Sequence, residues 1–269
     1  MVRLFLYGLL CRGAPFMTEL IVSDLTVNAG DKTLVSDASF SLSPREFVCL
    51  LGPNGAGKTS LIRAALGLQK STHGLAEVAG TDTRKLHPAE RAKCVSYLPQ
   101  IRPLAWPSRV GDVVALGRFS YGAASGRLKP ADLVAVQSEI ERCELEDLAQ
   151  RNADTLSGGE LARMHCARAF AAETPLFVAD EPTAALDPRH QFRILELIKA
   201  YVAKGGGALV VLHDIQMAAR YASRLIWMKE GRILADGTPE DTLTVERLKE
   251  IYGINASIDG RRVEVAGPV

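Results

Sequence analysis

The chain is poor in cysteine, in aromatic residues and in long apolar runs. Five cysteines are scattered over 269 residues, an odd number with no C-x-x-C spacing, at Cys11, Cys49, Cys94, Cys143 and Cys166. This pattern excludes a disulfide framework and a cysteine-based zinc site, and it indicates reduced thiols in a cytosol. No apolar run reaches the roughly 18–20 residues that a membrane-spanning helix needs, so we expect no transmembrane segment.

An excess of charge of either sign is also missing. The chain has 32 Lys and Arg residues against 31 Asp and Glu, which leaves a net charge of +1. Nucleic-acid-binding proteins usually carry a basic face, so this balance speaks against a nucleic-acid partner. The hydrophobic share of 47% is that of an ordinary globular protein, and the length suits one large domain or a core with a subdomain.

The beginning of the chain resembles a signal peptide only in part. Residues 1–11 combine one charge with a short apolar stretch but have no small-residue cleavage site. We therefore expect Met17 to be the working start, and we expect residues 1–18 to have no fixed structure.

The sharpest positive signal is a phosphate loop with the pattern G-x-x-x-x-G-K-[ST]. Its residues are Gly52, Pro53, Asn54, Gly55, Ala56, Gly57, Lys58 and Thr59. An apolar run, Phe47–Leu51, precedes the loop and predicts a buried strand, and Ser60–Leu66 predicts a helix behind it. Strand, glycine loop and helix form the context that this motif requires.

The chemistry of the phosphate loop follows from its residue types. Glycines let the backbone wrap closely around a phosphate chain with its N–H groups pointing inward, and the helix that opens at Ser60 adds its partial positive charge. Lys58 is expected to reach the β and γ phosphates, and the hydroxyl of Thr59 is expected to bind Mg²⁺. The loop therefore predicts a site for ATP and Mg²⁺.

Strand and helix signals alternate along most of the chain, which predicts an α/β fold with a mostly parallel sheet. Helical signals dominate residues 103–153, and we interpret them as a small helical subdomain inserted into the core. A break at Gly122–Gly126 divides this insertion, and the core resumes with a buried strand at Leu176–Ala179. At the C-terminal end, residues 256–269 predict a hairpin that turns at Asp259-Gly260.

Two further segments carry chemistry. Asp180 and Glu181 follow an apolar strand, where one carboxylate can lie near Mg²⁺ and the next can polarise a water molecule. In Leu156–Glu160, Ser157 and Glu160 form a capping box, and Gly158 and Gly159 expose N–H groups at a helix N-terminus. Two half-sites for phosphate, far apart in sequence, suggest two chains that face each other.

The order of these motifs resembles that of an ATP-binding cassette (ABC) ATPase. The motifs are the phosphate loop, Gln100, Leu156–Glu160, Asp180-Glu181, Ala185–Asp187 and His213, and the resemblance covers residues 19–255. It implies a P-loop NTPase core with an antiparallel β portion besides its parallel sheet. It also implies a head-to-tail homodimer, in which ATP lies between the phosphate loop of one chain and Ser157–Glu160 of the other.

The resemblance also implies roles for single residues. Glu181 would be the general base, His213 would hold the γ phosphate and orient Glu181, and Asp187 would lie at the dimer seam. Gln100 would touch Mg²⁺ or the attacking water, so that Thr59, Gln100 and Asp180 surround the metal. The remaining histidines, His190 among them, receive a purely structural interpretation.

Two positions depart from the family pattern. Ala29 stands where the family usually has an aromatic residue that stacks on adenine, about two dozen residues before the phosphate loop. Leu161 stands where the Ser157–Glu160 motif usually continues with a polar residue, whereas Arg163 follows as expected.

Several segments resemble one branch of the family, the importers of iron–siderophore complexes, haem and cobalamin. These segments are Asp112–Arg118, Leu186–Gln191, Leu212–Tyr221, Gly237–Glu240 and Leu248–Gly253. The branch implies separate permease subunits, a periplasmic or surface substrate-binding protein, and a peripheral position on the cytoplasmic face of the inner membrane. Uptake of molybdate or of Mn/Zn is the nearest alternative. A soluble ABC ATPase without a membrane partner is another, although such proteins usually hold two cassettes or a long coiled-coil insertion.

Overall fold

The computed structural model describes residues 18–101, 107–123 and 127–269. The expected start at Met17 and the centre of the Gly122–Gly126 break lie outside these ranges. The chain divides into two compact units. The phosphate-loop unit holds Glu19–Leu86 and Ala208–Val269, and the helical unit holds His87–Gly207 with Thr18.

An antiparallel sheet opens the phosphate-loop unit. Its strands, in the order β2-β1-β4-β5, are β2 (Lys32–Leu42), β1 (Leu20–Ala29), β4 (His73–Val78) and β5 (Thr81–Asp82). Alternating residues of β1 and β2 are buried in facing pairs, such as Val22 with Phe40 and Val27 with Val35. The period of two in the sequence therefore becomes one buried face and one exposed face.

The second group of strands in this unit surrounds β3 (Phe47–Leu51), whose five residues are all buried. It pairs in parallel with β8 (Gly207–Val211) and β9 (Arg224–Lys229), and β10 (Arg232–Gly237) lies antiparallel to β9. The helices of the unit are α2 (Lys58–Ala65), α8 (Ile215–Tyr221), α9 (Pro239–Thr242) and α10 (Val245–Tyr252). A hairpin of β11 (Ile254–Asp259) and β12 (Arg262–Pro268) ends the chain.

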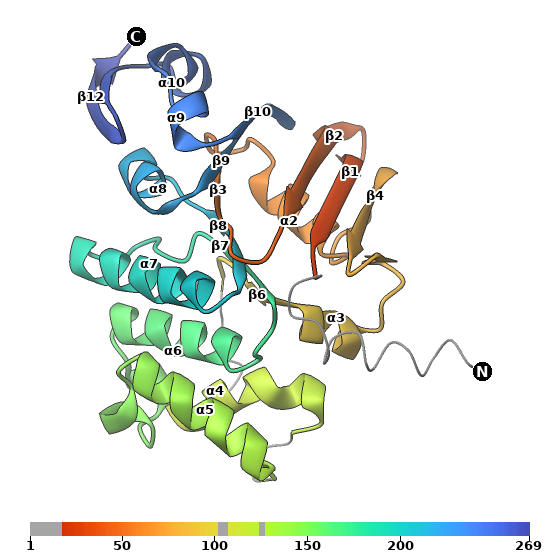
Figure 1. Ribbon diagram of the computed structural model, residues 1–269, viewed down its shortest axis with the longest axis vertical. Helices are drawn as coiled ribbons and strands as arrows, with labels where there is room; N and C mark the ends of the chain where they lie inside the picture. Colours follow the sequence, from red (N-terminus) through yellow and green to blue (C-terminus); the bar gives the residue numbers. More distant parts are fainter. Residues whose placement is uncertain (1–17, 102–106, 124–126) are drawn as a thin grey trace. The chain divides into compact units, whose positions relative to one another are not determined.

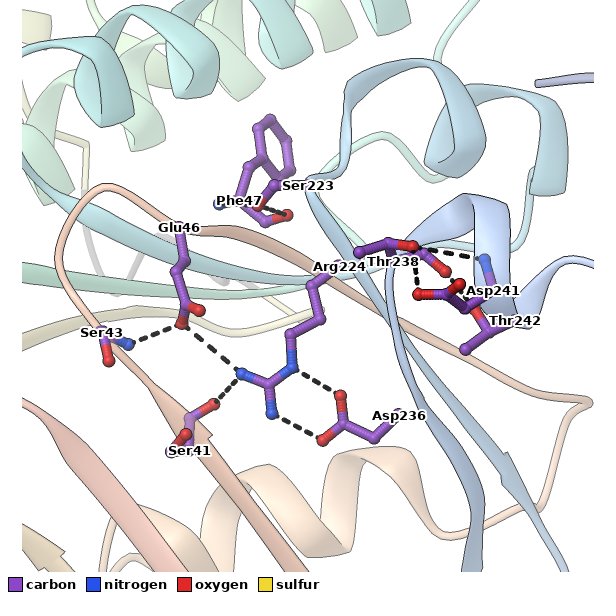
Figure 2. Close-up of polar contacts among 10 residues, drawn as sticks. All are labelled: Ser41, Ser43, Glu46, Phe47, Ser223, Arg224, Asp236, Thr238, Asp241 and Thr242. Carbon is purple, nitrogen blue, oxygen red and sulfur yellow. Dashed lines mark hydrogen bonds and ion pairs between the residues drawn. The ribbon is translucent and has the colours of Figure 1, made fainter. Parts of the chain in front are cut away.

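Arg224 ties three strands of the phosphate-loop unit together (Figure 2). From β9, its Nε and Nη2 atoms donate to the two carboxylate oxygens of Asp236 on β10, at 2.5 and 2.6 Å. Its Nη1 atom donates to the Ser41 carbonyl of β2 at 3.2 Å and lies 3.6 Å from Glu46. Such a bidentate pair holds the guanidinium in a fixed plane, and Asp236 raises the pKa of Arg224.

The helical unit has a short parallel pair of strands, β6 (Val95–Leu98) and β7 (Leu176–Asp180). Its α-helices are α3 (Pro88–Cys94), α4 (Val110–Ala115), α5 (Pro130–Arg142), α6 (Gly158–Phe170) and α7 (Pro188–Ala203). Three 3-10 helices join them, η1 (Leu116–Tyr121), η2 (Glu146–Leu148) and η3 (Ala153–Thr155). Figure 1 shows α6 with α4 and α5 on one side and α7 on the other.

Most expected elements are confirmed, but the C-terminal hairpin turns at Gly260-Arg261 rather than at Asp259-Gly260. The sequence also predicts a turn over Ser71–Gly74, which is wrong in its second half because β4 begins at His73. It predicts a helix at Leu145–Ala149, where the structure has a single 3-10 turn. The four described cysteines are free and buried, as expected for reduced thiols, and burial raises the pKa of the Cys49 and Cys143 thiols.

Arg118 is the polar centre of the helical unit. It is 6% exposed, and its Nε donates to Asp132 of α5 at 2.9 Å. Its Nη1 donates to the Ala171 carbonyl at 3.0 Å and to Glu173 at 2.7 Å, beyond the end of α6. The guanidinium also lies 4.0 Å from the ring centre of Tyr121. One buried cation therefore joins η1 to α5 and α6.

We predict that Asp132→Ala destabilises the protein strongly. Removing one partner of a buried ion pair leaves charge in a dry environment, so the free energy of unfolding should fall by about 3 kcal/mol. Urea denaturation measures this change. The control Asp147→Ala, at an exposed position of η2, should stay within about 0.5 kcal/mol of wild type. Equal effects of the two substitutions would show that the Arg118 ion pair is not important for stability.

Candidate functional site

The expected site residues divide between the two units. The phosphate-loop unit carries residues 52–60 and His213, and the helical unit carries Gln100, Ser157–Glu160, Asp180, Glu181 and Asp187.

The phosphate loop leads from β3 to α2 and has no room for side chains at two of its glycines. A Cβ atom on Gly52 would lie 2.1 Å from the Met228 carbonyl oxygen of β9. A Cβ atom on Gly57 would lie 2.3 Å from the Leu34 carbonyl oxygen of β2, and Gly57 also has a φ of +97°. At Gly57 only glycine fits both the nearby carbonyl and the left-handed backbone, and at Gly52 only glycine fits beside the Met228 carbonyl. The loop therefore packs directly against β9 and β2.

Lys58 folds back over this loop. Its Nζ atom donates to the carbonyls of Gly52 at 2.7 Å and Pro53 at 2.9 Å, and the residue is only 6% exposed. Its next neighbour, Thr59, is exposed. The loop backbone thus lies beside the Lys58 ammonium group and the accessible Thr59 hydroxyl, at the start of a helix. This combination of groups can bind a polyphosphate chain together with its metal ion.

A tyrosine from the C-terminal part of the unit lies near Gly52, and its buried hydroxyl makes no hydrogen bond among the described residues. Burial raises the pKa of the Tyr252 phenol, at the end of α10, to about 12, and the N–H of Gly52 opposes this rise. Tyr252 could not be predicted from the sequence, because almost 200 residues separate it from Gly52 and no spacing rule joins them.

Gln100 and Glu181 meet in the helical unit. The Nε2 atom of Gln100 donates to Oε2 of Glu181 at 2.6 Å. The register explains this contact, because Leu98 pairs with Ala179 and each site residue follows its strand partner by two positions. Asp180 is fully buried, and the backbone of Glu181 has a φ of +50°. Strained backbone of this kind is concentrated at functional sites, where the surrounding fold must hold it.

The capping box at the start of α6 is confirmed. The N–H of Ser157 donates to Glu160 Oε2 at 2.8 Å, and the N–H of Glu160 donates to Ser157 Oγ at 3.4 Å. These bonds hold the pKa of the Glu160 carboxyl below its ordinary value, with the Ser157 backbone N–H as the largest cause. The motif therefore fixes the first turn of α6, with Gly158 and Gly159 inside it.

Asp187 begins α7 in the same manner. Its carboxylate accepts the backbone N–H of His190 at 3.0 Å, and both of its oxygens lie 2.9 Å from Nδ1 of the His190 ring. The purely structural interpretation of His190 overlooked this contact with a site residue. The D-P-R-H spacing could have indicated it, since the third residue of a helix lies over the N-cap.

The expected magnesium ligands fit that ion in type. Thr59, Gln100 and Asp180 would supply a hydroxyl, an amide oxygen and one carboxylate, and Mg²⁺ typically binds one or two carboxylates together with phosphate oxygens and water. The described residues contain no group of three or more His, Cys, Asp or Glu that could hold a metal by themselves.

Residues 35–184 match the family model described as ABC transporter. The match covers more than half of the chain and includes the phosphate loop, Gln100 and Asp180-Glu181. This chain belongs to the ABC transporter family. It is an ABC ATPase, whose architecture is the expected α/β core with a largely parallel sheet, an antiparallel β portion and added helices.

Curated relatives match this ABC ATPase over almost its whole length. The hemin import ATP-binding protein HmuV of Pseudomonas fluorescens (strain Pf0-1) is 35% identical over 240 residues, which are 87% of this chain and 92% of that protein. The protein of the same name from Plesiomonas shigelloides is 35% identical over 253 residues, 87% of this chain and 95% of that protein.

Solved structures of ABC ATPases share the fold. An ATP-binding subunit of an ABC transporter is 26% identical with a TM-score of 0.74, over 88% of this chain and 95% of the matched chain. An ABC cassette in its ADP conformation is 24% identical with a TM-score of 0.78, over 88% of this chain and 98% of the matched chain.

Among the helices that the structure describes, none is both long and apolar enough to cross a lipid bilayer.

We predict that two glycines of the phosphate loop differ in their tolerance of alanine. Gly55 has a φ of +79° but open space around it, so Gly55→Ala should cost about 1 kcal/mol of unfolding free energy from backbone strain alone. Gly57→Ala adds the collision with the Leu34 carbonyl and should cost about 3 kcal/mol. Urea denaturation of the nucleotide-free protein compares them, and equal costs would contradict the packing of the loop against β2.

Proposed function

We propose that this chain is the ATP-hydrolysing subunit of a haem importer, attached to separate permease subunits at the cytoplasmic face of the inner membrane. The observation that carries the proposal is the 35% identity to hemin import ATP-binding proteins over nearly the whole chain. Segments such as Leu186–Gln191 and Leu212–Tyr221, which resemble the importers of iron–siderophores, haem and cobalamin, support the same branch. An ABC ATPase makes no contact with cargo through its own site, so the assignment of haem as the substrate comes from these relatives.

In this proposal two copies of the chain bind ATP head to tail. The phosphate loop and Ser60 of one copy hold the phosphates, while Lys58 leaves the Gly52 and Pro53 carbonyls to reach the β and γ phosphates. Ser157, Gly158, Gly159 and Glu160 of the other copy close over the nucleotide with the N-terminus of α6. The charge that an arginine finger neutralises in other NTPases would be met by this helix start.

Glu181 is the proposed base for the attacking water. The Gln100 amide donates to one oxygen of its carboxylate at 2.6 Å, and a carboxylate held in this way can accept a proton from water. His213 would orient this carboxylate and contact the γ phosphate, and Asp187 would lie at the seam between the copies. When bound by Thr59, Gln100 and Asp180, Mg²⁺ would neutralise phosphate charge.

The helical unit is the proposed contact with the permease. Several of its described large apolar side chains are exposed, among them Ile101 directly after Gln100 at 78%, and Leu116 at 46% and Phe119 at 73% in η1. Exposed apolar side chains mark a partner-binding surface where they gather in one patch, and Leu116 and Phe119 share one 3-10 helix. A contact here would link the permease to Gln100, and through Gln100 to the proposed base. A substrate-binding protein outside the membrane would complete the importer.

We predict that Glu181→Gln abolishes turnover but keeps ATP binding. An amide cannot accept the proton of water, so the rate of hydrolysis should fall by about 10²–10⁴-fold. The matched variant Lys58→Ala should lose ATP binding itself, since it removes the charge that meets the phosphates. Phosphate release and the fluorescence of a labelled ATP measure the two effects. Normal hydrolysis by Glu181→Gln would exclude Glu181 as the base, and unchanged binding by Lys58→Ala would exclude the phosphate-loop site.

We predict that the tagged chain purifies from solubilised native membranes together with a polytopic permease. Vesicles that contain this complex should accumulate haem when ATP is supplied, and vesicles with Glu181→Gln should not. Uptake of an iron–siderophore, cobalamin, molybdate or Mn/Zn in place of haem would replace the substrate and leave the importer in place. Recovery of ribosomes or DNA-bound proteins without a permease would instead support a soluble ABC ATPase.

A further inference from the structure

His190 stands between two segments of the proposed site, within the helical unit. Its imidazole is 30% exposed, and Nδ1 lies 2.9 Å from both carboxylate oxygens of Asp187. The opposite edge of the ring faces the first turn of α6. A Cβ atom on Gly159 would lie 2.1 Å from Cδ2 and 2.4 Å from Nε2 of the ring. The imidazole therefore occupies the space where any other residue at position 159 would place its side chain.

Of the two glycines in the first turn of α6, only Gly159 lies against the His190 ring. Gly158, one residue earlier, has only ordinary contact distance to its nearest neighbour, at 3.9 Å from Leu186. The Asp187 carboxylate is held by the His190 backbone as well as by its ring, and both keep the pKa of Asp187 below its ordinary value, the backbone more than the ring. His190 thus caps the start of α7 together with Asp187, and its ring packs against the start of α6.

We propose that His190 is a positioning residue for ATP hydrolysis, which holds Asp187 and the first turn of α6 together as one rigid element. The inference rests on the proposed dimer, in which Asp187 lies at the seam and Ser157–Glu160 closes over the ATP of the other copy. Both segments must reach the partner copy at the same moment. A rigid link between them removes one independent motion from closure, and small errors of position at a catalytic site are costly in rate.

Kinetics of three variants test the role of the ring. We expect His190→Ala to lower kcat about tenfold with little change in KM for ATP, because the phosphate loop still binds ATP in its own chain. His190→Asn places an amide nitrogen where Nδ1 was, so it should recover part of the lost kcat. Arg189→Ala is the matched control, since this neighbour is exposed. An unchanged kcat in His190→Ala, or equal losses in the Ala and Asn variants, would overturn the proposal.

A double-mutant cycle with Gly159 tests the packing. Gly159→Ala should lower the thermal unfolding midpoint less in the His190→Ala background than in wild type, because the space of the ring is then free. Equal shifts in the two backgrounds would mean that ring and glycine are not coupled, and they would overturn the proposed link.

Dimer formation separates this inference from the function on which it rests. The Glu181→Gln protein should form an ATP-dependent dimer in size-exclusion chromatography with light scattering, and adding His190→Ala should weaken that dimer. A dimer of equal strength with and without His190 would overturn the inference alone. Absence of any ATP-dependent dimer in Glu181→Gln would overturn the proposed ATP sandwich, and the inference with it.

Discussion

Buried strands place most of the proposed chemistry, because each of them must end before the backbone can turn toward a ligand. β3 ends directly before Gly52, β6 two residues before Gln100, β7 at Asp180, and β8 two residues before His213. Inside a strand, the backbone groups that face a neighbouring strand pair with it, whereas N–H groups beyond its end can turn toward a ligand. Within the helical unit the parallel register makes this concrete, since it brings Gln100 to Glu181.

Helix N-termini supply the second part of the site. α2, α6 and α7 begin with N–H groups that have no partner inside the helix, so each start needs a capping arrangement. Gly57 provides a left-handed backbone for α2, Ser157 and Glu160 form a capping box on α6, and Asp187 caps α7. The side-chain bonds of Ser157 and Asp187 fix the first turns of α6 and α7 within the chain itself. A site prepared in this way loses little entropy when it meets phosphate.

Local sequence patterns predict those parts of the proposed site whose residues are close neighbours in the chain. The phosphate loop, the capping box and the strand before Asp180 were all predicted from spacing, because the residues that define them lie within a few positions of each other. The ring of His190 over Gly159, the Tyr252 phenol at Gly52 and the two carbonyls that exclude a side chain at Gly52 and Gly57 were not. These contacts join segments that are far apart in sequence, where no period or motif gives the distance.

The C-terminal hairpin shows how such distant contacts extend to the segment of His213. The next residue, Asp214, caps α8, and the Gln216 side chain of α8 bonds to both the carbonyl of Arg261 and the N–H of Val263. Arg261 in turn donates to the Ala219 and Ala222 carbonyls near the far end of α8, at 3.3 and 3.1 Å. A seven-residue helix is too short to be stable alone. The hairpin therefore stabilises both ends of the helix that follows His213. Through Arg261 and Val263 it supports the segment that carries this proposed site residue.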